Sequence, residues 1–274
     1  MLDEAMQLLK LQFDQCMEIV GKDPYYRGYA EEKWRHSLQV FGAGNYLVRH
    51  VDWLKNKSLS YIEMVRTAVL LHDVCRFTEI AYKFNQDGAC DHGVSGATLL
   101  KNTPMFHDVR IWLPIKQHGH LIEQIYMDDE YINIEDAKLR REIELICFLI
   151  RDADKIANLN MLVHEPKVYH LFFGKSKEDY VPETDGYVSE RVQEKAFVET
   201  TAPRFAHGTV ADYVVGYVSW FMDINYQSAM DYCNKLHLVE ALFEMLENYC
   251  ADESFKSKYA AFVRNYLRKH FFLP

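Results

Sequence analysis

The amino-acid sequence predicts an all-α protein, on three observations. Apolar residues recur at helical spacing along several stretches, as in helices that bury one face. Glycine and proline are scarce, at 12 and 7 of 274 residues, which disfavours a turn-rich β architecture. Hydrophobic residues make up 49% and aromatic residues 14% of the chain, enough to bury a sizeable core.

Two predicted helices open the chain. Residues 2–20 are predicted to form an amphipathic helix, which ends at the helix-breaking segment Gly21–Pro24. A second helix is expected over 31–51, and its periodicity turns His36 inward. The glycines of Gly42-Ala43-Gly44 follow no predicted strand, so they indicate close helix packing and not a dinucleotide-binding loop.

The third helix, residues 60–73, ends at an adjacent His72-Asp73 pair. Neighbouring helix positions differ by about 100°, so both side chains reach one inward site only near a helix end. The polar segment 77–92 is predicted to be a loop or lid over that site. A short helix is then expected from His92 to Lys101.

Two further helices are expected to deliver polar residues. Residues 106–120 carry His118, and a long helix over 135–163 carries Asp154 beside its buried line. Burying that carboxylate without a partner would cost several kcal/mol, so Asp154 needs a cation or several donors.

The last part of the chain carries no recognisable chemistry. Residues 174–186 read as a surface connection, and 187–270 as an aromatic-rich, helical segment. We expect one domain over 1–170 and a helical extension over 171–274 packed on it, with one continuous domain as the alternative.

Charge and cysteine content restrict partners and compartment. A formal net charge of −9 disfavours a long nucleic acid, because phosphate backbones are bound by basic surfaces. The six cysteines are scattered without a CxxC pair, as expected of free thiols in a reducing cytosol. Acidic residues interrupt the N-terminal apolar segment, and no apolar run approaches the ~18 residues of a membrane span. We expect a cytoplasmic protein without a membrane partner. The sequence does not decide whether the protein is a monomer or a homo-oligomer.

Imidazoles and carboxylates stand at spaced positions along these helices. They are His36, His72-Asp73, His92, His118 and the tract Arg151-Asp152-Ala153-Asp154-Lys155. These side chains bind divalent transition metals such as Mn, Fe, Co, Ni and Zn, and an open metal site lowers the pKa of bound water toward neutrality. The pattern indicates a metal-dependent hydrolase.

The same segments resemble a known family. The stretches RHSLQV, LLHDVCRF, HGVSGATLL, IKQHGH and RDADKIANL are similar in order to the HD-domain superfamily of metal-dependent phosphohydrolases. That family is marked by a His, an adjacent His-Asp and a distal Asp on an all-helical bundle. The resemblance covers about residues 30 to 165, so it implies an HD-domain helical bundle followed by a C-terminal helical extension.

The resemblance also implies a ligand set and a cofactor. The primary ligands it implies are His36, His72, Asp73 and Asp154. Asp73 would bridge if two metals bind, and His92 and His118 match the additional histidines of family members with dinuclear centres. The implied cofactor is a divalent transition metal, Mn, Fe, Co, Ni or Zn, with one or two ions per chain.

Further residues are expected near the reaction. Arg76 occupies a position where relatives carry a basic side chain for phosphate, and with Lys155 it would neutralise developing charge. Asp73 or Asp152 would orient the water or accept its proton, while the metal polarises the phosphoryl oxygen. His120 is an alternative or additional ligand, and Glu32, one turn before His36, is a further candidate.

The expected function is hydrolysis of a phosphorylated small molecule, with a nucleotide as the first choice. The four-His, two-Asp set also resembles the inositol-cleaving di-iron oxygenases of the superfamily. A third interpretation is a non-catalytic regulator that binds a metal or nucleotide without turning it over.

Overall fold

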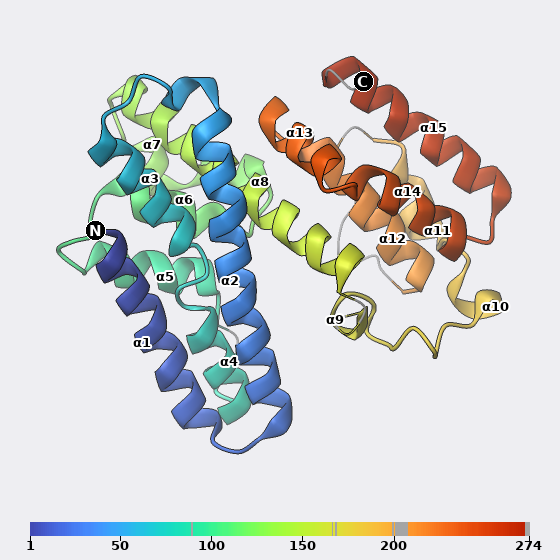
Figure 1. Cartoon of the computed structure of the whole chain (residues 1–274), viewed down its shortest axis with the longest axis horizontal. Coiled ribbons are helices and arrows are strands. Elements are labelled where there is room, and N and C mark those ends of the chain that lie inside the picture. The colour runs from blue at the N-terminus through green and yellow to red at the C-terminus, as the bar shows by residue number, and fades with distance from the viewer. Residues whose placement is uncertain (89, 166, 168, 199, 201–207, 272–274) are drawn as a thin grey trace. The chain divides into compact units, whose positions relative to one another are not determined.

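The described part of the chain is helical. The computed structural model describes residues 1–88, 90–165, 167, 169–198, 200 and 208–271, and within these ranges it contains helices and no strand (Figure 1). The all-α prediction is confirmed. No helix among the described residues is long and apolar enough to cross a membrane.

By its internal contacts the chain divides into two compact units, Met1–Asp154 and Lys155–Pro274. The division falls within one long helix, α8 (Ala137–His164), and therefore earlier than the boundary drawn from the sequence between 170 and 171.

The first unit is a bundle in which helices distant in the sequence pack together (Figure 1). Its helices are α1 (Leu2–Val20), α2 (Pro24–His50), η1 (Asp52–Leu54), α3 (Leu59–Leu70), α4 (Arg76–Asn85), α5 (His92–Lys101), α6 (Val109–Gln117), η2 (Ile122–Met127), α7 (Asp129–Ile132) and the first part of α8. Helix α2 packs on α3, α1 on α4, α3 on α6 and α5 on α6. The bundle therefore brings the ends of α3 and α6 and the start of α5 into one neighbourhood.

Helix α2 begins earlier than the sequence indicated, at Pro24 and not near residue 31. The carboxylate of Asp23 accepts hydrogen bonds from the backbone N–H groups of Tyr25 and Tyr26, both at 3.0 Å. A capping aspartate followed by proline is a favourable helix start, because proline has the helical φ and its missing N–H costs nothing there. The segment interpreted as a breaker is thus both the end of α1 and the cap of α2.

The prediction of a loop or lid over residues 77–92 is wrong for most of this segment, because helix α4 occupies Arg76–Asn85. Phe77, Ile80 and Ala81 lie on one face of α4 and are buried. Three apolar positions at helical spacing outweigh the polar residues at the end of the segment. The helix stops at Gln86, which adopts a left-handed conformation with φ 61°.

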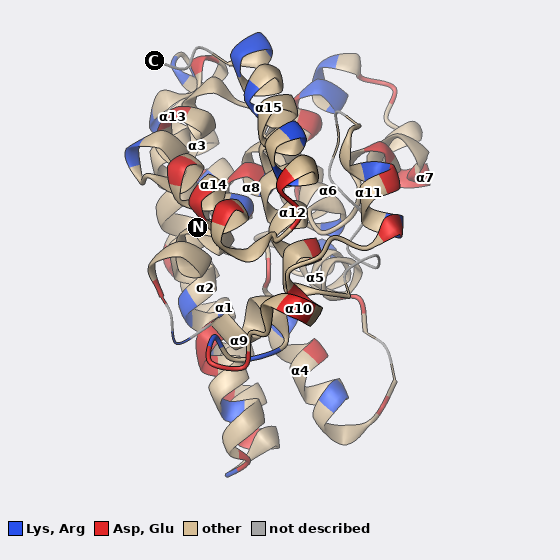
Figure 2. Ribbon diagram, turned by 90° about the vertical axis from the view of Figure 1, so that its right-hand side faces the viewer, with Lys and Arg blue, Asp and Glu red and all other residues tan. Residues whose placement is uncertain are grey.

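The second unit is also helical. Its elements are the last part of α8, α9 (Tyr169–Phe173), α10 (Pro182–Asp185), α11 (Glu190–Ala196), α12 (Val210–Ser219), η5 (Trp220–Asp223), α13 (Gln227–Lys235), α14 (Leu238–Tyr249) and α15 (Glu253–His270). Helix α12 packs on α14, and α13 and α15 also pack on α14. Acidic and basic residues are interspersed along helices such as α11 and α15 (Figure 2).

Candidate metal centre

The His72-Asp73 pair lies where the chain leaves α3. That helix ends at Leu70, and both side chains are buried, with exposed fractions of 0% and 2%. The backbone turns between α3 and α4, which lets two consecutive side chains face the same interior region.

One group of possible ligands consists of His36, His72 and Asp73, whose ligand atoms lie within 4.8 Å of one another. The Nε2 atom of His72 lies 3.8 Å from Asp73 Oδ2 and 4.0 Å from Asp154 Oδ1. Asp154, on α8, also contacts His36 Nε2 at 2.9 Å. The four residues named as primary ligands thus converge in the first unit.

A second group consists of Asp73, His92 and His118, again within 4.8 Å. His92 Nε2 lies 3.1 Å and His118 Nε2 3.4 Å from Asp73 Oδ1, and the two Nε2 atoms are 3.4 Å apart. Asp73 therefore belongs to both groups.

The backbone orients the two fully buried rings. His72 Nδ1 donates to Val69 O at 3.0 Å, and His118 Nδ1 donates to Ile115 O at 2.7 Å. A carbonyl accepts only, so each Nδ1 carries a proton and Nε2 is the ring atom that faces the centre. His92 obtains the same arrangement from a carboxylate, since its Nδ1 lies 3.1 Å from Glu79 Oε2.

Burial and the neighbouring charged groups keep His72 neutral and the carboxylates of Asp73 and Asp154 ionised. Burial lowers the pKa of His72 to about 4, so the ring is neutral at pH 7. Burial opposes ionisation of Asp73, but Arg76 and the neighbouring imidazoles hold its pKa well below the usual range. Burial likewise opposes ionisation of Asp154, whose pKa is nevertheless lowered by the hydrogen bond with His36.

These residues fit a divalent metal. His72 Nε2 is buried and has no hydrogen-bond partner among the described residues. In the second group Asp73 Oδ1, His92 Nε2 and His118 Nε2 lie 3.1 to 3.4 Å from one another, and Arg76 Nη2 is the cationic group beside them, 2.8 Å from His92 Nε2. Ligand atoms about 2.1 Å from a common metal would lie about 3 to 4.2 Å apart, so the spacing suits N and O ligation.

Three other predicted residues have different surroundings. Asp152 is fully buried on α8. Lys155, in the second unit, pairs with Asp223 Oδ2 at 2.8 Å, so its charge is already compensated. His120 Nε2 lies 2.9 Å from Asp91 Oδ2, and His120 is in neither group. Their catalytic or ligand roles stay predictions.

Glu32 and Arg76 each have salt-bridge partners. Glu32 pairs with Arg35, both side chains are half-buried, and Glu32 is in neither group. Arg76 Nε lies 3.3 Å from Asp73 Oδ2, and its Nη1 lies 2.6 Å from Glu79 Oε2. A phosphate bound by Arg76 would share the guanidinium with these carboxylates.

The sequence pattern does not single out Glu79, because the polar segment that contains it indicates a loop. On α4, Glu79 stands three residues after Arg76, which puts the two side chains on neighbouring positions of the helix surface. Burial opposes its ionisation, but His92, Arg76 and Lys83 lower the pKa of Glu79 to about 2. The signal that could have identified it is this spacing.

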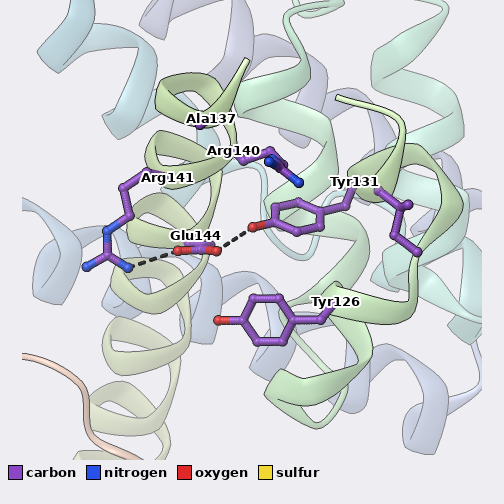
Figure 3. Close-up of a pocket in the computed structure, with 7 residues that line it drawn as sticks. Tyr126, Tyr131, Ala137, Arg140, Arg141 and Glu144 are labelled. Atoms are coloured by element: carbon purple, nitrogen blue, oxygen red, sulfur yellow. Dashed lines mark hydrogen bonds and ion pairs between the residues drawn. The ribbon is translucent and has the colours of Figure 1, made fainter. Parts of the chain in front are cut away.

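A pocket of about 470 Å³ elsewhere in the first unit shares no residue with the two groups (Figure 3). Tyr126 and Tyr131 face the start of α8 across it, and Glu144 accepts hydrogen bonds from Tyr131 Oη and, at 2.9 Å, from Arg141 Nη1. Its carboxylate is thus satisfied within the wall, and the pocket lacks the ligand arrangement of the metal centre.

The first unit is a helical domain with two His/Asp groups that could hold a metal ion. Residues 34–159 match the family model of the HD domain. HD domains are generally metal-dependent hydrolases that bind divalent metals. A search of curated proteins and a search of solved structures each gave no significant match.

Proposed function

We propose that this protein is a metal-dependent phosphohydrolase that acts on a phosphorylated small molecule, with nucleotides as the class to test first. The observation that carries the proposal is the sharing of buried Asp73 between two groups of ligand atoms. One carboxylate that serves both groups would hold two cations close together, an arrangement suited to displacement at phosphorus.

The residues have distinct tasks in this proposal. The side chains that would hold the metal are His36, His72, Asp73, His92, His118 and Asp154. A divalent metal in such a site supplies a Lewis acid and water that deprotonates near neutral pH. Arg76 would stabilise negative charge on the phosphoryl group, and Asp152 is the candidate to accept a proton from the water. The buried positions of His72 and Asp73 exclude bulk water and strengthen these interactions.

The test is a hydrolysis screen with nucleoside mono-, di- and triphosphates and sugar phosphates, each with Mn, Co, Ni or Mg. At least one compound should release phosphate or a nucleoside. Asp73→Ala should lower the rate by ~10³-fold or more, because it removes a ligand from both groups. Arg76→Ala should lower it by ~10 to 10³-fold through loss of charge stabilisation.

Arg110→Ala is the matched control for Arg76→Ala. Arg110 also pairs with two carboxylates of the first unit, those of Asp108 and Glu142, but contacts neither ligand group. Its loss should leave the rate within about threefold of wild type. A metal-loaded wild-type protein that hydrolyses nothing in the panel, or full activity of Asp73→Ala, contradicts the proposal.

A di-iron oxygenase is the second candidate, because both ligand groups together contain four His and two Asp once Asp154 is included. Iron content and substrate-dependent oxygen uptake separate it from the hydrolase. Tight binding of a nucleotide without product formation would instead favour a regulator.

A further inference from the structure

Glu79 is a buried carboxylate beside the second ligand group. It lies on α4, and its side chain is 10% exposed. Burying a carboxylate costs free energy unless donors compensate it. Here Lys83 Nζ lies 2.6 Å from Oε1, while Arg76 Nη1 lies 2.6 Å and His92 Nδ1 3.1 Å from Oε2.

The contact with His92 differs from those that orient the other two rings. His72 and His118 each donate Nδ1–H to the carbonyl three residues earlier, near the end of a helix. His92 is the first residue of α5, so the chain before it has left the helix. It therefore depends on a side chain from another helix, and the packing of α4 on α5 brings Glu79 there.

The same carboxylate restrains a competing cation. Arg76 Nη2 lies 2.8 Å from His92 Nε2, the atom that faces Asp73 and His118. A guanidinium that donates to this lone pair competes with a metal for it. Because Glu79 binds Nη1 of the same guanidinium at 2.6 Å, it also fixes Arg76 beside His92, and a metal at this group would have to displace the contact of Nη2 with His92.

We propose that Glu79 is a positioning residue for a second metal, which would be bound by Asp73, His92 and His118. Its carboxylate fixes the His92 ring with Nε2 toward the centre and holds the Arg76 guanidinium beside that ring. The proposal rests on the metal centre of the proposed function, but makes a separate statement about how one of the two groups is held.

The experiment is a Mn²⁺ titration of the metal-free full chain. Binding is measured by isothermal titration calorimetry and by electron paramagnetic resonance. Wild type should bind two equivalents. Glu79→Ala should retain one and weaken the other by ~10 to 100-fold, the usual effect of removing a partner that orients a ligand. Glu79→Gln keeps an oxygen that can accept from His92 Nδ1, so it should weaken the second equivalent less than alanine does. Circular dichroism establishes that each variant is folded.

Glu142→Gln is the matched control. Glu142 has a side chain 11% exposed and pairs with Lys57 at 2.6 Å and Arg110 at 3.3 Å, so it resembles Glu79 in burial and in having two cationic partners. It should bind both equivalents like wild type. The proposal is overturned if wild type binds one equivalent, if folded Glu79→Gln and Glu79→Ala both bind as wild type does, or if either change weakens both equivalents alike.

These titrations use no substrate. Two-metal binding that depends on Glu79, in a protein without phosphatase activity, would remove the proposed hydrolase and leave this inference standing. Active protein with an unchanged second equivalent in the Glu79 variants would do the reverse.

Discussion

Substitution of Gly44 by alanine tests how the approach of α2 to α3 supports the metal centre. A Cβ atom at Gly44 would lie 3.2 Å from Val69 Cγ2 and 3.3 Å from Val69 Cβ, and closer still to Cγ1. Ordinary carbon contacts are about 3.5 to 4.0 Å, so Val69 must change rotamer or the helices must separate. Overpacking of this kind costs ~1 to 3 kcal/mol, against a gain of ~1 kcal/mol from replacing glycine in a helix.

Gly42→Ala is the internal control. Gly42 is on the same helix, is exposed, and an added Cβ there would have no atom within 4 Å. Gly42→Ala should be stabilising by up to ~1 kcal/mol through helix propensity alone. The two variants share the propensity effect, so the difference in their free energies of unfolding, ~1 to 3 kcal/mol, isolates the contact with Val69.

The assay is urea denaturation followed by circular dichroism, together with Mn²⁺ affinity. His36 lies two turns from Gly44, and its ring centroid is 5.8 Å from that of His72. Separation of the helices should therefore also weaken metal binding in Gly44→Ala and not in Gly42→Ala. Combining Gly44→Ala with Val69→Ala should cost less than the sum of the single changes. Equal stability of the two glycine variants would refute the reasoning.

Three further predictions concern the metal and the second unit. Mn²⁺ at 100 times its dissociation constant should raise the free energy of unfolding of wild type by ~2.7 kcal/mol per site, measured by thermal unfolding. Addition of a chelator, or the substitution Asp73→Ala, should remove this stabilisation. An unfolding midpoint that does not change with Mn²⁺ would contradict a metal centre. His118→Ala should reduce bound Mn²⁺ from two equivalents to one by elemental analysis, and retention of both would exclude His118 as a ligand. Asp212 is fully buried and accepts from the N–H groups of Ser189 and Gly208 at 2.8 and 2.9 Å, so Asp212→Ala should cost ~2 to 4 kcal/mol in urea denaturation. A loss below ~0.5 kcal/mol would show that these donors find other partners.

Much of the first unit could be predicted from the sequence because its signals are local. Helices α1 and α5 begin and end as the periodicity and the breaker residues indicated. The position of His72 and Asp73 at a helix end followed from the geometry of adjacent side chains. The interpretation of the Gly42-Ala43-Gly44 glycines as close helix packing is confirmed at Gly44, which lies against Val69, and is wrong at Gly42, where an added Cβ would have no atom within 4 Å.

The parts that could not be predicted depend on partners distant in the sequence. Periodicity marks Lys155 as near a buried face, but nothing local indicates that its ammonium group pairs with Asp223. The partner of His120 is Asp91, which caps the start of α5 and is 29 residues earlier in the sequence. A charged side chain can reach any residue within its length, so its partner follows only from the packing of the helices.

The replacement of the expected lid by α4 changes how the second ligand group is held. Asp73 lies three residues before the start of α4, Arg76 is its first residue and Glu79 follows three residues later, and the Arg76 guanidinium contacts both carboxylates. The last of these carboxylates reaches His92 on α5. A segment that opened as a lid would separate Glu79 from His92 and release the ring. The buried apolar face of α4 opposes that motion, so access to the centre is expected through side-chain movement, with Arg76 the residue placed to make it.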